Sequence, residues 1–334
     1  MSKEAMFYHT REDQKVECRL CPHDCLIDSQ KYGKCGVRFN DNGFLQALTY
    51  GQVSALHLDP IEKKPLYHYY PGSQILSLGS YGCNLQCTFC QNYEISQESC
   101  NAYVTSKTTP EYLVVKALEN TENIGLAYTY NEPTIFYEMM YDTAVLAKEH
   151  GLLNVVVSNG YINTQPLEKL LTVIDCFNID LKSFSNDFYT KVTGGRLSPV
   201  LRNLKLIRTS GAHLEITFLL IPELNDDTEQ FSNMVNWIHD ELGSRTVLHI
   251  SRYFPHYKLN IPATPISQLT EFYNFAKTKL DFVYLGNVAG ETGCNTNCPV
   301  CNHVVVRRKG YSIDASGLDG FGKCRFCGDP ILQC

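Results

Sequence analysis

The feature that most constrains this chain is a loop with three closely spaced cysteines. Cys83, Cys87 and Cys90 follow the spacing C-x3-C-x2-C, directly after a short apolar run that predicts a β-strand leading into a glycine-containing loop. Three thiolates on one loop can hold three irons of a four-iron cluster, which leaves the fourth iron open to a substrate or cosubstrate. Phe89 would shield one side of the cluster. The alternative is a surface loop whose cysteines hold zinc or no metal.

With Tyr81 and Gly82 ahead of Cys83, this loop resembles the signature of the radical S-adenosylmethionine (SAM) enzymes. In that superfamily the open iron takes the amino and carboxylate groups of SAM. The resemblance therefore implies a [4Fe-4S] cluster on the three cysteines and SAM as the cosubstrate.

The composition limits the expected partners and location. The chain has 334 residues, 44% of them hydrophobic and 19% charged, as in an ordinary globular protein. A net charge of −6 does not favour binding to a phosphate backbone, so we expect no nucleic-acid partner. The N-terminus is polar and no apolar run approaches the ~18 residues of a membrane span, so we expect a cytoplasmic protein without a membrane partner.

The chain contains fifteen cysteines, which in a reducing compartment would be metal ligands or plain thiols because disulfides do not persist there. Most of them fall into three tight groups. Cys100, Cys176 and Cys334 stand apart and are expected to be ordinary thiols.

The first group predicts an N-terminal metal-binding module. Cys18, Cys21, Cys25 and Cys35 are spaced C-x2-C-x3-C-x9-C, and four thiolates can hold either zinc or an auxiliary iron-sulfur cluster. Both metals remain open on the sequence alone. His23 lies inside the group, and we expect it on the surface because four cysteines already complete a metal shell.

The middle of the chain alternates predicted strands with predicted helices, which indicates parallel βα units. Seven strands separated by six helices are expected near residues 75–79, 124–128, 153–157, 175–180, 213–221, 246–252 and 282–286. This pattern predicts an α/β fold with a partial (β/α)6 barrel. The expected organisation is an N-terminal module over 1–70, the barrel over 71–290 and a C-terminal module over 291–334.

Several residues predict where helices begin and end. A hydroxyl side chain ahead of proline is typical of a helix start, and glycine is typical of a helix end. The expected start signals are Thr109-Pro110, Ser198-Pro199 and Thr264-Pro265, and Gly211 is an expected end signal.

Polar residues follow successive strands at the carboxyl edge, where α/β barrels place their active sites. They are Asn131, Glu132, Ser158, Asn159, Asp180 and Lys182. Each has a structural alternative. Glu132 could stabilise a helix N-terminus, Asn159 could belong to a turn, and Asp180 and Lys182 could form an ion pair.

A bound SAM molecule would use these side chains. Glu132 would accept a hydrogen bond from the amine, whereas Asn159 and Asp180 would bond the ribose or the carboxylate. Lys182 would pair with the carboxylate. Phe89, Asn131 and Ser158 complete the predicted cofactor site.

A third cysteine group predicts a C-terminal module of the zinc-ribbon type. Cys298-x2-Cys301 and Cys324-x2-Cys327 form two knuckles that can close a tetrahedron around zinc. Cys294 complicates this interpretation because Cys294, Cys298 and Cys301 repeat the C-x3-C-x2-C spacing. An auxiliary iron-sulfur cluster, with or without Cys294 as a ligand, is the alternative.

The chain also resembles a particular branch of the radical SAM superfamily, the radical SAM enzyme of the AmmeMemoRadiSam system, which is similar to pyruvate formate-lyase activating enzyme. The resemblance rests on the segments CRLCPHDC, GKCGVR, GLAYTYNEPTIFYE, DLK, LLIPELND and HISRYFPHYK and on the cluster loop. In the activating enzymes a Gly-Gly-Glu segment meets the SAM amine, and here Glu132 is preceded by Tyr130 and Asn131. The resemblance also implies a SAM-contacting histidine, for which His249 and His256 both lie near the matching place.

We expect a radical SAM enzyme that cleaves SAM to a 5′-deoxyadenosyl radical and abstracts hydrogen from an unidentified small molecule or peptide. One alternative is an activating enzyme for a glycyl-radical enzyme, and another is a non-catalytic zinc-binding interaction protein. The resemblance implies an electron donor such as flavodoxin or ferredoxin. It also implies Memo-like and AMMECR-like partner proteins.

Overall fold

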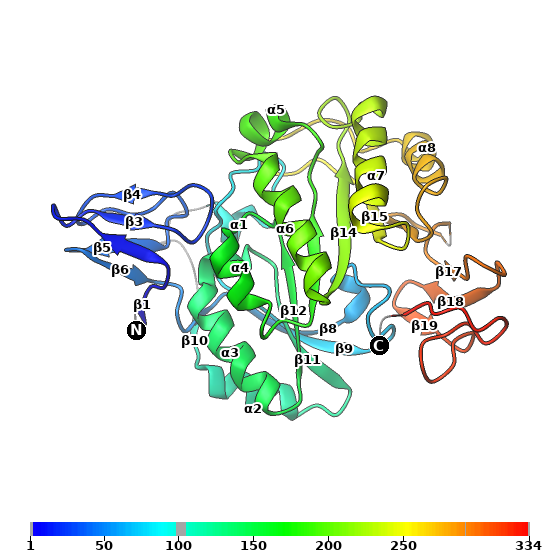
Figure 1. Cartoon of the computed structure of the whole chain (residues 1–334), viewed down its shortest axis with the longest axis horizontal. Coiled ribbons are helices and arrows are strands. Elements are labelled where there is room, and N and C mark those ends of the chain that lie inside the picture. Colours follow the sequence, from blue (N-terminus) through cyan, green and yellow to red (C-terminus); the bar gives the residue numbers. More distant parts are fainter. Residues whose placement is uncertain (1–2, 98–104, 291, 333–334) are drawn as a thin grey trace.

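An eight-stranded sheet forms the centre of the computed structural model, which describes residues 3–97, 105–290 and 292–332 (Figure 1). Its strands lie in the order β16-β15-β14-β13-β12-β11-β9-β8. Their bounds are β8 Ala55–Pro60, β9 Gln74–Gly79, β11 Asn123–Tyr128, β12 Leu153–Ser158, β13 Cys176–Asp180, β14 His213–Leu220, β15 Val247–Arg252 and β16 Val283–Gly286. Neighbours from β9 to β16 are parallel, whereas β8 pairs antiparallel with β9.

The sheet is an open barrel, because β8 and β16 lie at its two edges and do not pair with each other. All seven predicted strands are present, each within one residue of its expected bounds. They form because continuous apolar runs suit parallel strands that are buried on both faces. The predicted partial α/β barrel is therefore confirmed.

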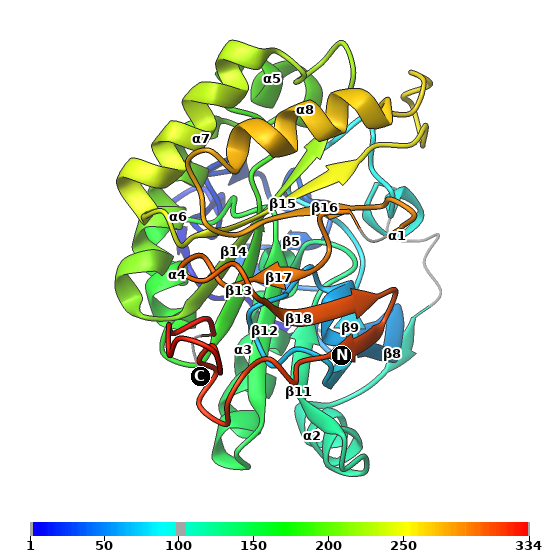
Figure 2. The ribbon, with the colours of Figure 1, turned by 90° about the vertical axis from the view of Figure 1, so that its right-hand side faces the viewer.

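Helices cover the outer face of the sheet (Figures 1 and 2). The longer ones are α2 Pro110–Leu118, α3 Tyr137–Glu149, α4 Thr164–Leu170, α6 Leu197–Ser210, α7 Thr228–Leu242 and α8 Ile266–Ala276. The short turns are η1 Ile61–Lys63, α1 Tyr93–Ser96, η3 Pro133–Phe136, α5 Asn186–Phe188 and η4 Tyr189–Thr193. Within the described residues, no helix is long and apolar enough to cross a bilayer.

The predicted helix boundaries were partly wrong. Thr109 caps α2 through its side-chain oxygen, and Gly211 ends α6 with a φ of +88°, both as expected. Ser198 lies inside α6, which begins one residue earlier, so it is not the cap. Thr264 does not cap α8 either, since its hydroxyl donates to the carbonyl of Leu220 at 2.6 Å.

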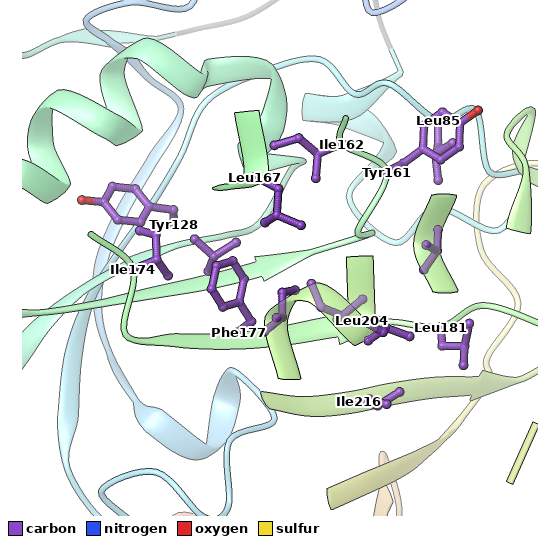
Figure 3. Packing of buried hydrophobic residues seen from close by; sticks show 14 of the residues in the cluster. Leu85, Tyr128, Tyr161, Ile162, Leu167, Ile174, Phe177, Leu181, Leu204 and Ile216 are labelled. Atoms are coloured by element: carbon purple, nitrogen blue, oxygen red, sulfur yellow. The ribbon is translucent and has the colours of Figure 1, made fainter. Parts of the chain in front are cut away.

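Apolar side chains fill the space between the sheet and its helices (Figure 3). Phe177 of β13 and Ile216 of β14 pack in one buried cluster with Leu204 of α6. Burying one such side chain stabilises the fold by about 1.5–3 kcal/mol. Leu85, within the three-cysteine loop, belongs to the same cluster and is 1% exposed. The core therefore anchors the loop that carries the cysteines.

The N-terminal residues form two small sheets at one end of the barrel (Figure 1). One contains β1 Lys3–Glu4, β6 Phe44–Ala47 and β5 Arg38–Asp41, and the other contains β2 Tyr8–Thr10, β3 Val16–Cys18 and β4 Leu26–Ile27. A buried ion pair joins them to the barrel, because the Arg38 guanidinium donates to Glu138 of α3 at 2.7 and 2.9 Å. A further two-stranded sheet pairs β7 Gln52–Val53 with β10 Ser106–Lys107.

The expectation that His23 is a surface residue is wrong. It is half-buried, its Nε2 lies 2.7 Å from the carbonyl oxygen of Asn84, and its ring centroid lies 5.1 Å from that of Tyr161. The cysteine spacing shows that a metal shell is complete but carries no information about which face of the module packs against the barrel.

The C-terminal module lies at the opposite end of the barrel from the N-terminal sheets (Figures 1 and 2). It contains β17 Thr296–Asn297, β18 Val304–Lys309 and β19 Ser312–Asp314. Arg308 of β18 is buried and donates to the Tyr67 carbonyl at 2.7 Å and to Thr296 at 2.8 Å. Tyr67 in turn donates its backbone N–H to Glu215, inside the barrel.

Buried polar groups continue from this contact into the barrel. Glu215 of β14 is fully buried and accepts from the ring Nε2 atoms of His213 and His249 and from the backbone N–H of His68. The His68 ring lies between Tyr284, with Nε2 2.5 Å from its hydroxyl, and the Ile331 carbonyl, 3.0 Å from Nδ1. This arrangement fits a neutral imidazole that accepts at Nε2 and donates at Nδ1.

We expect stability to fall below neutral pH because of His68. The pKa of His68 is lowered to about 3, mainly by burial; Glu215 and the Ile331 carbonyl oppose this shift, whereas Arg308 and His213 add to it. As the pH falls below about 6.5, the unfolded chain binds a proton at His68 that the folded chain does not bind. The free energy of unfolding therefore falls by about 1.4 kcal/mol for each pH unit. Urea unfolding at pH 7 and pH 5 should therefore give a free-energy loss roughly 2 kcal/mol larger for the native chain than for His68→Asn. Equal losses would contradict a neutral buried His68.

Candidate active site

A cavity of about 430 Å³ opens at the carboxyl edge of the barrel strands. All the residues predicted to bind the cluster or the cofactor line it. They are Cys83, Cys87, Phe89, Cys90, Asn131, Glu132, Ser158, Asn159, Asp180 and Lys182. The structure thus brings together residues from the cluster loop and from the ends of three further strands.

Asn131 holds the start of the cluster loop. Its Oδ1 accepts from the backbone N–H of Ser80 at 2.9 Å, and its Nδ2 donates to the carbonyl of Gly82 at 3.0 Å. Gly82 has a φ of +84°, and a side chain there would collide with Val37 of the N-terminal module at 2.6 Å. Gly82 is therefore required both by the turn and by the neighbouring module.

Cys87 is buried in the cavity wall, and Cys83 and Cys90 are half-buried there. Burial raises the pKa of the Cys83 and Cys90 thiols and raises that of Cys87 to about 12. The backbone N–H of Leu85 lies 3.3 Å from the Cys83 sulfur, and Nδ2 of Asn159 lies 3.8 Å from it. A positively charged metal centre would favour the thiolates, and these N–H groups would then be donors to sulfur.

Glu132 is buried at the centre of a hydrogen-bond network. Oε1 accepts from the Ser158 hydroxyl at 2.7 Å and from the Thr134 backbone at 2.9 Å, and Oε2 accepts from the Asn159 backbone at 2.9 Å. Burial raises the pKa of Glu132, while these donors lower it. Glu132 thus caps η3 and also lines the cavity, so its structural role and a ligand-binding role are compatible.

Asp180 and Lys182 form an ion pair on the cavity wall, with Nζ 3.0 Å from Oδ2. Lys182 Nζ also lies 5.8 Å from the centre of the Phe89 ring. Burial lowers the pKa of Lys182, but Asp180, Cys87 and Tyr189 together raise it above its usual value. Lys182 is therefore a fixed cation close to the cluster loop.

Asn159 already has protein partners for both ends of its amide. Nδ2 donates to Asn84 at 2.9 Å, and Oδ1 accepts from the Tyr161 backbone at 2.8 Å. Gly160 follows with a φ of +68°, so this segment is also a turn. The bond to Asn84 ties the end of β12 to the cluster loop.

Two lysines that line the cavity were not predicted from the sequence. Lys63 and Lys64 line the cavity and both bond Asp59, at 2.8 and 2.7 Å, and the Tyr130 hydroxyl donates to the same carboxylate at 2.5 Å. Tyr130 has a φ of +69°, an uncommon conformation for a bulky residue. The two lysines precede Pro65, and no motif in the sequence around them indicates a binding site.

The candidate histidines lie elsewhere among the described residues. His249 bonds Glu215 below the cavity, with Nε2 2.5 Å from Oε2, and His256 packs on Tyr93 with ring centroids 5.5 Å apart. Neither lines the cavity.

A second group of cysteines lies in the C-terminal module and can bind a metal ion. The sulfurs of Cys298, Cys301, Cys324 and Cys327 all lie within 4.8 Å of one another. Cys294 is not part of this group, and its thiol donates to the Arg308 carbonyl at 3.2 Å. Of the cysteines expected to be ordinary thiols, Cys176 is buried in β13, whereas Cys100 and Cys334 lie outside the described residues.

An open parallel barrel with a three-cysteine loop at its carboxyl edge defines a radical SAM enzyme, and the family model described as "Radical SAM superfamily" matches residues 78–235. The chain belongs to the family of "Uncharacterized protein MJ0808" from Methanocaldococcus jannaschii, with 43% identity over 332 residues and 98% coverage of both chains. The finding that the chain is an enzyme contradicts the alternative of a non-catalytic zinc-binding protein.

More distant relatives have named activities. The chain is 25% identical over 162 residues to the pyruvate formate-lyase-activating enzyme of Clostridium pasteurianum, covering 47% of this chain and 66% of that enzyme. A radical SAM methyltransferase from Sphaerobacter thermophilus aligns with a TM-score of 0.52, 12% identity and coverage of 68% of this chain and 71% of that one. Streptococcus suis SuiB bound to S-adenosylmethionine aligns with a TM-score of 0.50, 12% identity and coverage of 65% and 49%. At these identities the two structures establish the fold alone.

Proposed function

We propose that the chain binds a [4Fe-4S] cluster on Cys83, Cys87 and Cys90 and uses it to cleave SAM reductively. One-electron reduction of such a cluster supplies the electron that splits SAM into methionine and a 5′-deoxyadenosyl radical, which then abstracts a hydrogen atom from the substrate. The protein supplies positioning and the exclusion of water.

One observation carries this proposal: the three cysteines and a rim of charged side chains line the same cavity. Glu132 would accept from the SAM amine, Lys182 would pair with the carboxylate, and Asp180 would bond the ribose. Asn159 contributes less to SAM binding than to the position of the cluster loop, because its amide already bonds Asn84 and the Tyr161 backbone.

We assign zinc to Cys298, Cys301, Cys324 and Cys327. Tetrahedral zinc with bonds of about 2.3 Å separates its thiolates by about 3.8 Å. The Cys298–Cys327 and Cys301–Cys324 sulfur distances of 3.4 and 3.6 Å support this assignment.

The substrate we favour is a small molecule or a peptide, and the location we favour is the cytoplasm. The reductant would be a flavodoxin or ferredoxin, and Memo-like and AMMECR-like proteins are proposed partners by resemblance alone. The second candidate function is activation of a glycyl-radical enzyme, favoured by the similarity to pyruvate formate-lyase-activating enzymes. A glycyl-radical enzyme encoded by a neighbouring gene would favour that second function.

The direct test is anaerobic reconstitution with iron and sulfide, followed by a reductant and SAM. We expect visible absorbance from the cluster and the formation of 5′-deoxyadenosine and methionine. A protein that takes up no iron at the cluster loop, or that binds a cluster and SAM without cleaving SAM, would reject the proposal.

Replacing Glu132 by Gln should weaken SAM binding. The Gln side chain keeps an acceptor for η3 but lacks the charge that favours the SAM amine, a contribution of about 1.5–3 kcal/mol that corresponds to a roughly 10- to 150-fold higher Kd. Equilibrium binding of SAM to the reconstituted variant measures this change, with the melting temperature as a check on folding. An unchanged Kd in a folded variant would remove Glu132 from the site.

A further inference from the structure

The N-terminal cysteines differ in geometry from the C-terminal ones. Cys18, Cys21, Cys25 and Cys35 line one cavity together with the apolar side chains Leu20, Ile27 and Ile135. No three sulfurs of these four described cysteines lie within 4.8 Å of one another, whereas the four C-terminal sulfurs do. Zinc would draw thiolates to about 3.8 Å from one another.

The three-cysteine loop also lacks the close sulfur spacing of the C-terminal group. Cys83, Cys87 and Cys90 line one cavity, and the three sulfurs of these described residues do not all lie within 4.8 Å of one another. Four irons and four sulfides stand between the thiolates of a cubane cluster, so such ligands lie farther apart than those of one zinc ion. The spacing of the N-terminal sulfurs therefore fits a cluster better than a single zinc ion.

A buried donor also faces the N-terminal cysteines. Arg38 lines the same cavity and is 1% exposed. Its two terminal nitrogens already have partners, because Nη2 donates to Glu138 and Nη1 donates to the Met6 carbonyl. Its Nε–H has no acceptor among the described groups. A buried N–H without a partner costs about 1–3 kcal/mol, and an anionic cluster or its thiolates would supply the acceptor.

The N-terminal module contacts both residues that flank Cys83. The carbonyl oxygen of Cys35 would lie 3.0 Å from a side chain at Gly82, and His23 Nε2 lies 2.7 Å from the carbonyl of Asn84. Asn163 strengthens this contact by bonding the carbonyls of Arg19 and Leu20. The two cysteine sites therefore meet through backbone contacts, with one residue, Gly82, between Cys35 and Cys83.

We propose that Cys18, Cys21, Cys25 and Cys35 hold a second [4Fe-4S] cluster that passes electrons to the three-cysteine site. A reduced flavodoxin or ferredoxin gives up one electron to this cluster. The same electron then moves to the neighbouring site, where cleavage of the carbon–sulfur bond of SAM consumes it. The N-terminal cluster is supported by the spacing of its own sulfurs and by Arg38, whereas the relay also rests on the proposed function.

Metal analysis of two complementary variants tests the cluster. When Cys83, Cys87 and Cys90 are all replaced by Ala, the anaerobically reconstituted chain should keep about four iron atoms and an iron-sulfur electron paramagnetic resonance signal on reduction. When the N-terminal four are replaced, the iron content should fall by about the same amount from that of the native chain. Cys176→Ala, which removes a buried thiol from β13, is the matched control and should keep the native iron content.

The result that overturns the cluster is an iron-free three-cysteine variant that holds two zinc ions per chain. This outcome can be read even when the N-terminal variant does not fold. If the three-cysteine variant holds a cluster and the native chain does not cleave SAM, the proposed function is rejected and the N-terminal cluster is retained.

Reductant dependence tests the relay. The N-terminal variant should still cleave SAM with the small reductant dithionite, whereas cleavage driven by reduced flavodoxin should fall at least about tenfold, or about 1.4 kcal/mol in barrier. An equal loss with both reductants, or no loss with either, would overturn the relay.

Discussion

Alanine at Cys87 should reduce 5′-deoxyadenosine formation to the level of a reaction without protein. Cys87 is one of only three thiolates that the cluster loop can provide, and a four-iron cluster with two protein ligands at this loop would not be held. The same result is expected for Cys83 and Cys90. The measurement is product formation after anaerobic reconstitution, with iron counted in parallel.

Thr88→Ala is the matched control, because Thr88 lies in the same loop and carries no thiol. It should retain cluster and activity. If a Cys87→Ala protein keeps an intact cluster elsewhere and cleaves SAM as fast as the native chain, this loop is not the reactive site.

Removal of the C-terminal metal should have the second largest effect. A structural zinc contributes about 10–16 kcal/mol to the folding of a small module, so Cys301→Ser should lose zinc and unfold β17 to β19. The barrel should be destabilised as well, because Arg308 of β18 bonds the Tyr67 carbonyl beside Glu215. Zinc content and the melting temperature of the whole chain measure the two effects.

Cys294→Ser separates the two interpretations of this cysteine group. Serine keeps a hydroxyl that can donate to the Arg308 carbonyl, so zinc and stability should both be retained. Loss of zinc from this variant, with retention in Cys301→Ser, would mean that Cys294 is a ligand and that the proposed set is incorrect.

The barrel could be predicted closely because its signals are local. Runs such as Leu153–Ser158 have an apolar centre of consecutive valines and lie between Gly151 and Asn159-Gly160, so the sequence indicates both the strand and its limits. The rim of the site follows from the same logic, since Glu132 and Asp180 come directly at strand ends that must meet at one edge.

What could not be predicted depends on contacts between distant segments. Lys64 reaches the cavity only because the chain after β8 turns beneath it and Asp59 and Tyr130 fix the ammonium group. Likewise, His23 lies against the cluster loop through a contact 61 residues away in sequence. Periodicity and spacing carry no information about such contacts.

The contact between Arg308 and Tyr67 has a consequence for the order of folding. Tyr67 and its neighbour belong to a segment that crosses the barrel interior and bonds Glu215, so this early stretch is secured by a residue made about 240 positions later. A ribosome will have released nearly the entire barrel before that guanidinium emerges. Until then the Tyr67 carbonyl of the nascent chain lacks the Arg308 donor that it bonds in the complete fold. Any oxygen-sensitive cofactor bound earlier would be held by a partly folded barrel.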